Sequence, residues 1–140
     1  MIVWMLVIFT ASRDLMSAEH TSRFIGPFLR WLAPEISAGA ILSVQFFVRK
    51  LAHFTEYAVL GALLWRALRR SLEKRTVFAA AFLIAALFAV SDEFHQSFVA
   101  SRTASPHDVL IDACGAAVGL MTCWVIVQRN KREAARVKSS

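Results

Sequence analysis

The chain has 140 residues, of which 57% are hydrophobic, and its mean hydropathy is +0.53. This length suits a single domain, and this hydropathy excludes an ordinary soluble one. A formal net charge of +6 would suggest a nucleic-acid partner in a soluble protein, but the basic residues are not interleaved with aromatic ones and match no RNA-binding motif. We therefore expect a membrane protein with no nucleic-acid partner.

Four apolar segments are candidates for membrane spans. A hydrocarbon core of about 30 Å needs a helix of roughly 20 residues, and Met1 to Ala11 is about half that length. This segment lacks the basic region and the cleavage site of a secretory signal, so we interpret it as a short or tilted span, or as a span whose natural start lies upstream. The other candidates are Leu51 to Leu68, Thr76 to Val90 and Val109 to Val127.

The residues between 12 and 47 contain no charge-free run that is long enough to cross the membrane. Within them Phe24, Ile25, Phe28, Leu29 and Leu32 recur at helical spacing. This pattern predicts a helix that lies in the outer membrane interface, which Pro27 and Pro34 bend or end. A more specific alternative is that this helix forms a lid over a binding or catalytic site.

Basic residues are concentrated at two places. One cluster begins in the last residues of the second candidate and ends before the third, and the other follows Val127: Arg66, Arg69, Arg70, Lys74, Arg75; Arg129, Lys131, Arg132, Arg136, Lys138. The positive-inside rule places both clusters in the cytoplasm. We therefore predict an all-α, multi-pass helix bundle of the bacterial inner membrane, with about four transmembrane helices. Its core covers residues 48–127, and a basic cytoplasmic tail covers 128–140.

A few residues at the helix ends and on the last span suggest how the bundle packs. Trp65 and Trp124 fall near the predicted cytoplasmic ends, where indole rings favour the headgroup level. Gly115 and Gly119 form a GxxxG spacing that lets another helix approach closely, within the bundle or in an oligomer. The two cysteines, nine residues apart on one helix, are expected to be unpaired packing residues.

Ionisable residues gather in the predicted outer half of the bundle. Helical spacing puts Lys50, His53 and Tyr57 on one face of the second span, with Glu56 beside them. Two further sets follow, one at the end of the third span and one in the next loop and the start of the fourth span: Asp92, Glu93, His95, Gln96; Arg102, Asp108, Asp112. Because a charged side chain that faces lipid is costly, we expect three helices to direct these groups into one polar site.

This predicted site is rich in acids, with five carboxylates against Lys50, Arg102 and two histidines. The excess negative charge requires protonated carboxylates, protonated histidines, a metal ion or a cationic ligand. The plainer alternative is a polar network that fixes the register of the helices and has no ligand.

Two stretches, RKLAHFTEYAVLG and SDEFHQSFVASRTASPHDVLIDACGAAVG, resemble the VanZ-like family of bacterial membrane proteins. The shared positions are Lys50, His53, Tyr57; Asp92, Glu93, Gln96; Arg102, Ser105, Asp108; Asp112, Gly115, Gly119. The resemblance covers Val48 to Val127 well and becomes weak over the first 47 residues. It implies a cell-envelope protein, and the family's namesake is associated with antibiotic resistance, to the glycopeptide teicoplanin. We do not carry the resistance itself over to this chain.

Three classes of function fit these residues. The first is a binding protein for a lipid headgroup or cell-wall precursor, with Lys50 and Arg102 contacting an anion. The second is an intramembrane hydrolase or transferase acting on a lipid-linked substrate, with His53 and Glu56, or His95 and Asp92, as base and orienting acid. A metal-dependent variant would draw its Zn²⁺ or Mn²⁺ ligands from a wider set: His53, His95, Asp92, Glu93, Asp108. The chain has no HExxH motif and no inverted repeat, which disfavours that variant and the third class, a transporter. We rank binding ahead of catalysis and assign no cofactor.

Overall fold

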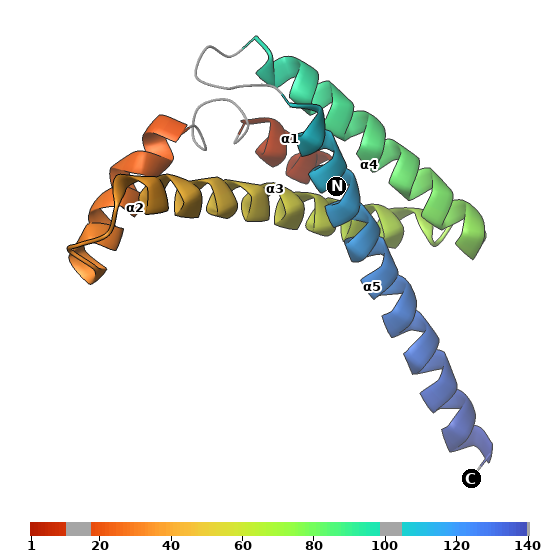
Figure 1. Ribbon diagram of the computed structural model, residues 1–140. Helices are drawn as coiled ribbons and strands as arrows, with labels where there is room; N and C mark the ends of the chain where they lie inside the picture. Colours follow the sequence, from red (N-terminus) through yellow and green to blue (C-terminus); the bar gives the residue numbers. More distant parts are fainter. Residues whose placement is uncertain (11–17, 99–104, 140) are drawn as a thin grey trace.

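The computed structural model describes residues 1–10, 18–98 and 105–139, and these residues form five α-helices (Figure 1). The helices are α1 (Ile2–Thr10), α2 (Ala18–Leu32), α3 (Ala38–Leu68), α4 (Lys74–Gln96) and α5 (Pro106–Ser139). The described residues contain no strand, so the predicted all-α class is confirmed for them.

The long helix α3 begins earlier than the sequence analysis predicted. Ser37 caps it, because the Ser37 hydroxyl accepts a hydrogen bond of 3.2 Å from the backbone N–H of Ala40. The predicted apolar segment, Leu51 to Leu68, is only the second part of this helix. Hydropathy falls at Arg49 and Lys50, but a helix continues through charged residues whose side chains reach polar partners. With 31 residues, α3 is about 46 Å long at 1.5 Å per residue.

The helix α2 packs against the first turns of α3 (Figure 1). A Cβ placed on Gly26 would meet the side chains of Gln45 and Ile41 at van der Waals distance. Pro34 lies just beyond the end of the helix, as predicted, but Pro27 lies inside α2 and does not end it. Large apolar side chains on its other sides are exposed, which suits a helix at a membrane interface: Phe24, Phe28, Trp31, Leu32.

Two described helices are long and apolar enough to cross a bilayer, over Arg75–Gln96 and Pro106–Val137. A four-span bundle is therefore not confirmed. The described part of α1 has 9 residues, about 14 Å, which is short of the hydrocarbon thickness. The helix α3 has sufficient length, but it carries Lys50, His53 and Glu56 along its middle.

The core lies where α3, α4 and α5 meet. A row of alanines at four-residue spacing on α4 lets that helix approach its neighbours closely, and larger side chains fill the space around it. The buried residues are Ile8, Tyr57, Leu60, Leu64, Trp65, Val77, Ala81, Ala85, Ala89, Ala116, Leu120. Trp65 is 3% exposed and faces this core, whereas Trp124 is 43% exposed. Their place at the headgroup level stays a prediction, because the burial of a side chain does not give its depth in the membrane.

Glycines bring α3 and α5 into backbone contact where the two helices cross (Figure 1). A Cβ on Gly115 would overlap the carbonyl oxygen of Phe54, and a Cβ on Gly119 would overlap that of Ala58. The predicted close approach at the GxxxG motif is thus made to α3 of the same chain. An oligomer formed through these glycines would have to displace α3.

Candidate functional site

Eight polar residues of the predicted site come together where α3, the end of α4 and the start of α5 meet. We call them the polar cluster: Lys50, His53, Asp92, Glu93, Gln96, Ser105, Asp108, Asp112. All but Lys50 and Ser105 are buried, and Asp92 and Asp112 are each 1% exposed. Such burial requires that each carboxylate be paired, protonated or hydrogen-bonded.

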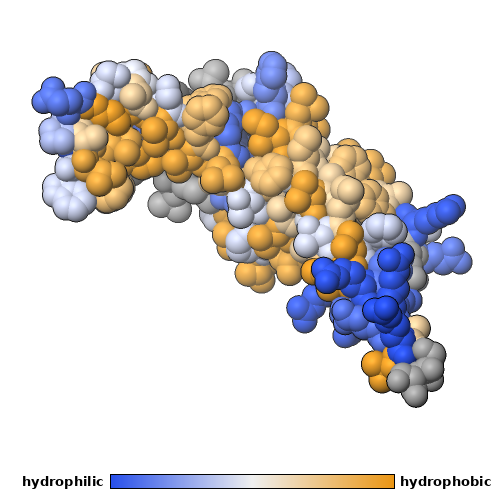
Figure 2. All heavy atoms as spheres, turned by 60° about the horizontal axis from the view of Figure 1, so that its bottom comes forward, coloured by the Kyte–Doolittle hydropathy of each residue, from blue (hydrophilic) through white to orange (hydrophobic). Residues whose placement is uncertain are grey.

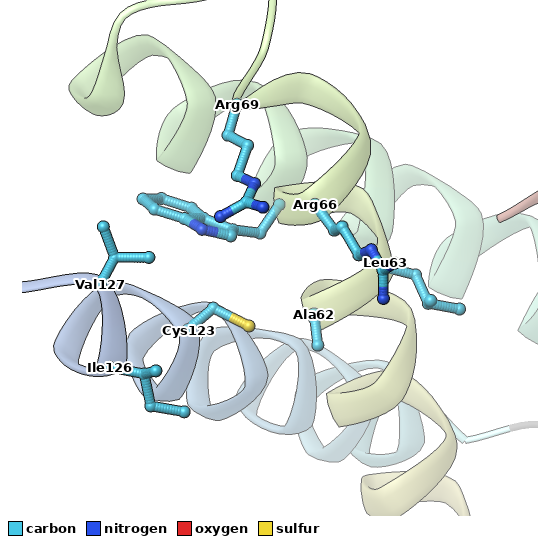
Figure 3. Close-up of a pocket in the computed structure, with 8 residues that line it drawn as sticks. Ala62, Leu63, Arg66, Arg69, Cys123, Ile126 and Val127 are labelled. Carbon is cyan, nitrogen blue, oxygen red and sulfur yellow. The ribbon is translucent and has the colours of Figure 1, made fainter. Parts of the chain in front are cut away.

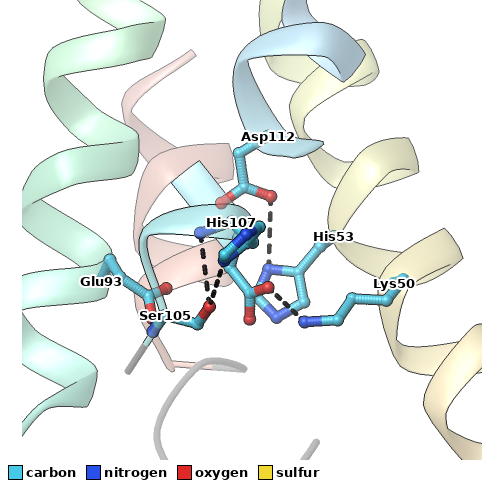
Figure 4. Close-up of polar contacts among 7 residues, drawn as sticks. Lys50, His53, Glu93, Ser105, His107 and Asp112 are labelled. Atoms are coloured by element: carbon cyan, nitrogen blue, oxygen red, sulfur yellow. Dashed lines mark hydrogen bonds and ion pairs between the residues drawn. The ribbon is translucent and has the colours of Figure 1, made fainter. Parts of the chain in front are cut away.

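Two polar contacts between side chains join α3 to α5 (Figure 4). The ammonium group of Lys50 forms an ion pair with Asp108. One helical turn further on, His53 Nδ1 lies 3.4 Å from Asp112 Oδ1. The spacing of three residues on α3 matches the spacing of four on α5, so two consecutive contacts form along the helix crossing. The glycine contacts that follow on α5 fix this register.

The end of α4 supplies the remaining acids of the polar cluster. Gln96 Nε2 donates a hydrogen bond of 2.9 Å to Asp92 Oδ2, one turn earlier on the same helix. The backbone N–H of Ser105 donates to Glu93 Oε1, which ties the residue before α5 to α4. Glu93 thereby accepts a hydrogen bond from the start of α5 across the connection between the two helices.

Ser105 caps α5 and so positions the first acid of that helix. Its hydroxyl accepts a hydrogen bond of 3.3 Å from the backbone N–H of His107, and Pro106 occupies the first helical position, where a missing N–H costs nothing. Asp108 has its side chain turned to Lys50. The serine and the aspartate of the SxxD motif therefore act differently, one on the helix backbone and one on α3.

Some buried oxygen atoms have no hydrogen-bond partner among the described residues. They include Glu93 Oε2, Asp112 Oδ2 and the hydroxyl of Tyr57, which lies one turn beyond His53 on α3. Four carboxylates of the polar cluster share one lysine and one histidine. The cluster can therefore accept further hydrogen bonds or positive charge at Glu93 and Asp112.

Comparison with protein-family models gives a match to VanZ/LLP1 over residues 1–127 of the 140. The chain belongs to the VanZ-like family. The match starts at Met1, so family membership extends over the first 47 residues, where the motif resemblance was weak. Searches of curated proteins and of solved structures gave no match. Family membership and the two apolar helices together indicate a membrane protein.

Two catalytic candidates of this VanZ-like protein lie beside α1. The ring of His95 stacks on Phe9, with ring centroids 4.3 Å apart, and the backbone carbonyl of Glu56 accepts a hydrogen bond of 3.0 Å from Trp4 Nε1. The sequence analysis missed both contacts from α1. The sequence of a short apolar helix that carries one indole and one phenyl ring does not predict which other helix these rings will contact.

Arg102 lies outside the described residues. Among the described residues, no group of three or more His, Cys, Asp or Glu side chains is arranged to hold a metal ion. Both cysteines are free. His53 contacts Asp112, a pairing that the catalytic alternative, which named Glu56 as the acid for His53, did not include.

Proposed function

We propose that this VanZ-like protein is a multi-pass protein of the bacterial inner membrane whose polar cluster binds a lipid or cell-wall-linked ligand from the extracytoplasmic side. The observation that carries the proposal is the buried excess of acid, with acceptor atoms of Glu93 and Asp112 unpartnered among the described residues. A network that only fixed helix register would be expected to satisfy its members. The Lys50 side chain is 23% exposed, so the cluster reaches the surface there.

The charge of the polar cluster indicates the chemistry of the ligand. Lys50 is already paired with Asp108, so it is not available to bind a phosphate or carboxylate. The remaining acceptors are carboxylate oxygens, which bind amines and hydroxyl groups. We therefore infer a headgroup that bears an amine or several hydroxyls, which revises the anion-binding role that the sequence suggested for Lys50.

The orientation follows from the position of the basic residues. Hydrophilic side chains gather at the end of the molecule near the C-terminus, while apolar side chains cover much of its middle (Figure 2). Asp108 and Arg129 are about 32 Å apart along α5, which is close to the hydrocarbon thickness. With the basic end in the cytoplasm by the positive-inside rule, the polar cluster lies at the opposite membrane face.

The catalytic alternative has no observation in its favour. His95 stacks on Phe9, and the Ser105 hydroxyl is used in a helix cap. The link to teicoplanin resistance belongs to the family's namesake, and the geometry of the polar cluster adds nothing to it.

Lipid-resolved mass spectrometry of the protein purified in mild detergent tests the proposal. We expect a lipid or lipid-linked glycan to copurify with the wild type and to be lost from His53→Ala, Glu93→Gln and Asp108→Asn. Membrane levels and thermal unfolding are expected to change little in the first two variants, because a site that reaches the surface tolerates the loss of one partner. Asp108→Asn is expected to be moderately less stable, because it leaves Lys50 without its partner. Glu35→Gln, an exposed acid on another part of the chain, is the matched control. Loss of folded protein in proportion to loss of ligand in all three variants would leave only a network that fixes the helix register.

A further inference from the structure

A groove lies at the other end of the contact between α3 and α5, about 18 Å along α3 from His53 to Trp65 at 1.5 Å per residue. Its volume is about 340 Å³. The residues that matter for its chemistry are Leu63, Trp65, Arg66, Arg69, Ile126, Val127. We call it the arginine groove. Figure 3 shows its two arginines on the α3 side of the gap and Ile126 and Val127 on the α5 side.

The two arginines give the arginine groove its charge. Arg66 and Arg69 are three residues apart, so they lie on one face at the end of α3, and no acidic residue lines the groove. Neither forms an ion pair with an acid of the described residues. A guanidinium group binds phosphate oxygens through two parallel N–H donors, so this pair suits a phosphate.

Trp65 provides an independent indication of a ligand. Its side chain is part of the wall and is 3% exposed, yet its indole N–H has no acceptor among the described residues. Buried indole N–H groups usually donate a hydrogen bond. An oxygen atom held by the neighbouring arginines would accept it.

We propose that the arginine groove binds an anionic phospholipid of the surrounding bilayer. Its phosphate contacts Arg66 and Arg69 and accepts the Trp65 N–H, and its acyl chains lie along Ile126 and Val127, which are apolar and line the same groove. Basic pockets between helices at the cytoplasmic membrane surface suit anionic headgroups. This site shares no residue with the polar cluster, so it stands or fails independently of the ligand proposed there.

Native mass spectrometry of the full chain in detergent tests this site. Dioleoylphosphatidylglycerol is titrated against dioleoylphosphatidylcholine, and inorganic phosphate is a separate arm. We expect the anionic lipid to bind at least about tenfold more tightly than the zwitterionic one, and Arg66→Gln with Arg69→Gln to abolish the difference, since a charged hydrogen bond contributes about 1.5–3 kcal/mol. Arg129→Gln with Arg132→Gln removes the same charge at the same spacing and is expected to bind as the wild type does.

Trp65→Phe keeps an aromatic ring and removes the donor, and we expect it to weaken lipid binding several-fold in the folded protein. Because Trp65 is part of the core, the smaller ring is expected to lower thermal stability modestly, so binding is measured below the unfolding transition. If the Arg66 and Arg69 variant fails to fold, Trp65→Phe decides the question alone. Equal loss in both double arginine variants would show attraction to net charge and overturn the site. Binding of inorganic phosphate as strong as that of the lipid would overturn the assignment to a phospholipid.

Discussion

The ion pair of Lys50 and Asp108 is partly open to solvent, with 23% and 11% of the two side chains exposed. Partial exposure lowers the cost of separating the partners, because water solvates a group that is left alone. The side chains next in line, those of His53 and Asp112, are less exposed, at 9% and 1%. At the scale of single residues, the solvent exposure of the polar cluster therefore decreases from Lys50 toward the glycine contact.

A double-mutant cycle measures the coupling of the first pair. We expect Lys50→Met and Asp108→Asn each to lower the free energy of unfolding in detergent by about 1–3 kcal/mol, because each leaves its partner uncompensated. The double variant is expected to lose less than the sum, since no charge is then left alone. Lys131→Met, an exposed lysine on α5, is the control and should be neutral. Additive losses would mean that the two side chains do not interact.

At the scale of elements, the contact of α3 with α5 determines which polar side chains meet. Helical spacing alone predicted that Lys50 and His53 share a face, and that Asp108, Asp112 and Gly115 continue another. It did not predict which acid each base contacts, because that choice depends on the relative translation of two helices. The close contacts of Gly115 with Phe54 and of Gly119 with Ala58 set this translation. A hydropathy pattern does not show such contacts between backbones.

Substitution of the glycines tests this role. We expect Gly119→Ala to lower the free energy of unfolding by about 1–3 kcal/mol, because its Cβ would overlap the carbonyl oxygen of Ala58 and force the helices apart. Gly39→Ala, in the first turn of α3, is the matched control: its Cβ would meet a single atom, Ser37 Oγ at 4.0 Å. That change should be neutral or stabilising by up to about 1 kcal/mol, from helix propensity. Chemical unfolding monitored by circular dichroism measures both. Equal effects at the two positions would contradict the role of Gly119.

At the scale of the whole molecule, the sequence predicted the all-helical class and the approximate position of α4 and α5, because long apolar runs without breakers have few alternatives. It did not predict that the Trp65 side chain faces the core, since position along a span says nothing of the direction in which a side chain points. It also missed the contacts of Trp4 and Phe9, which arise from the packing of a helix far away in the chain. The proposed orientation rests on the basic residues near the C-terminus and after α3, and labelling from one side of the membrane measures it directly.

Accessibility of single cysteines determines the orientation. In a variant with Cys114→Ala and Cys123→Ser, we expect a membrane-impermeant maleimide added to intact spheroplasts to label Ser97→Cys and not Ser71→Cys, because α4 separates the two positions. Both serines are exposed, so protection by folding does not explain a difference. Ser71 follows Arg69 and Arg70, which the positive-inside rule holds in the cytoplasm. Permeabilised membranes are the control and should give labelling of both. Labelling of Ser71→Cys alone in intact spheroplasts would show the opposite orientation, with the polar cluster on the cytoplasmic side and the arginine groove on the other side.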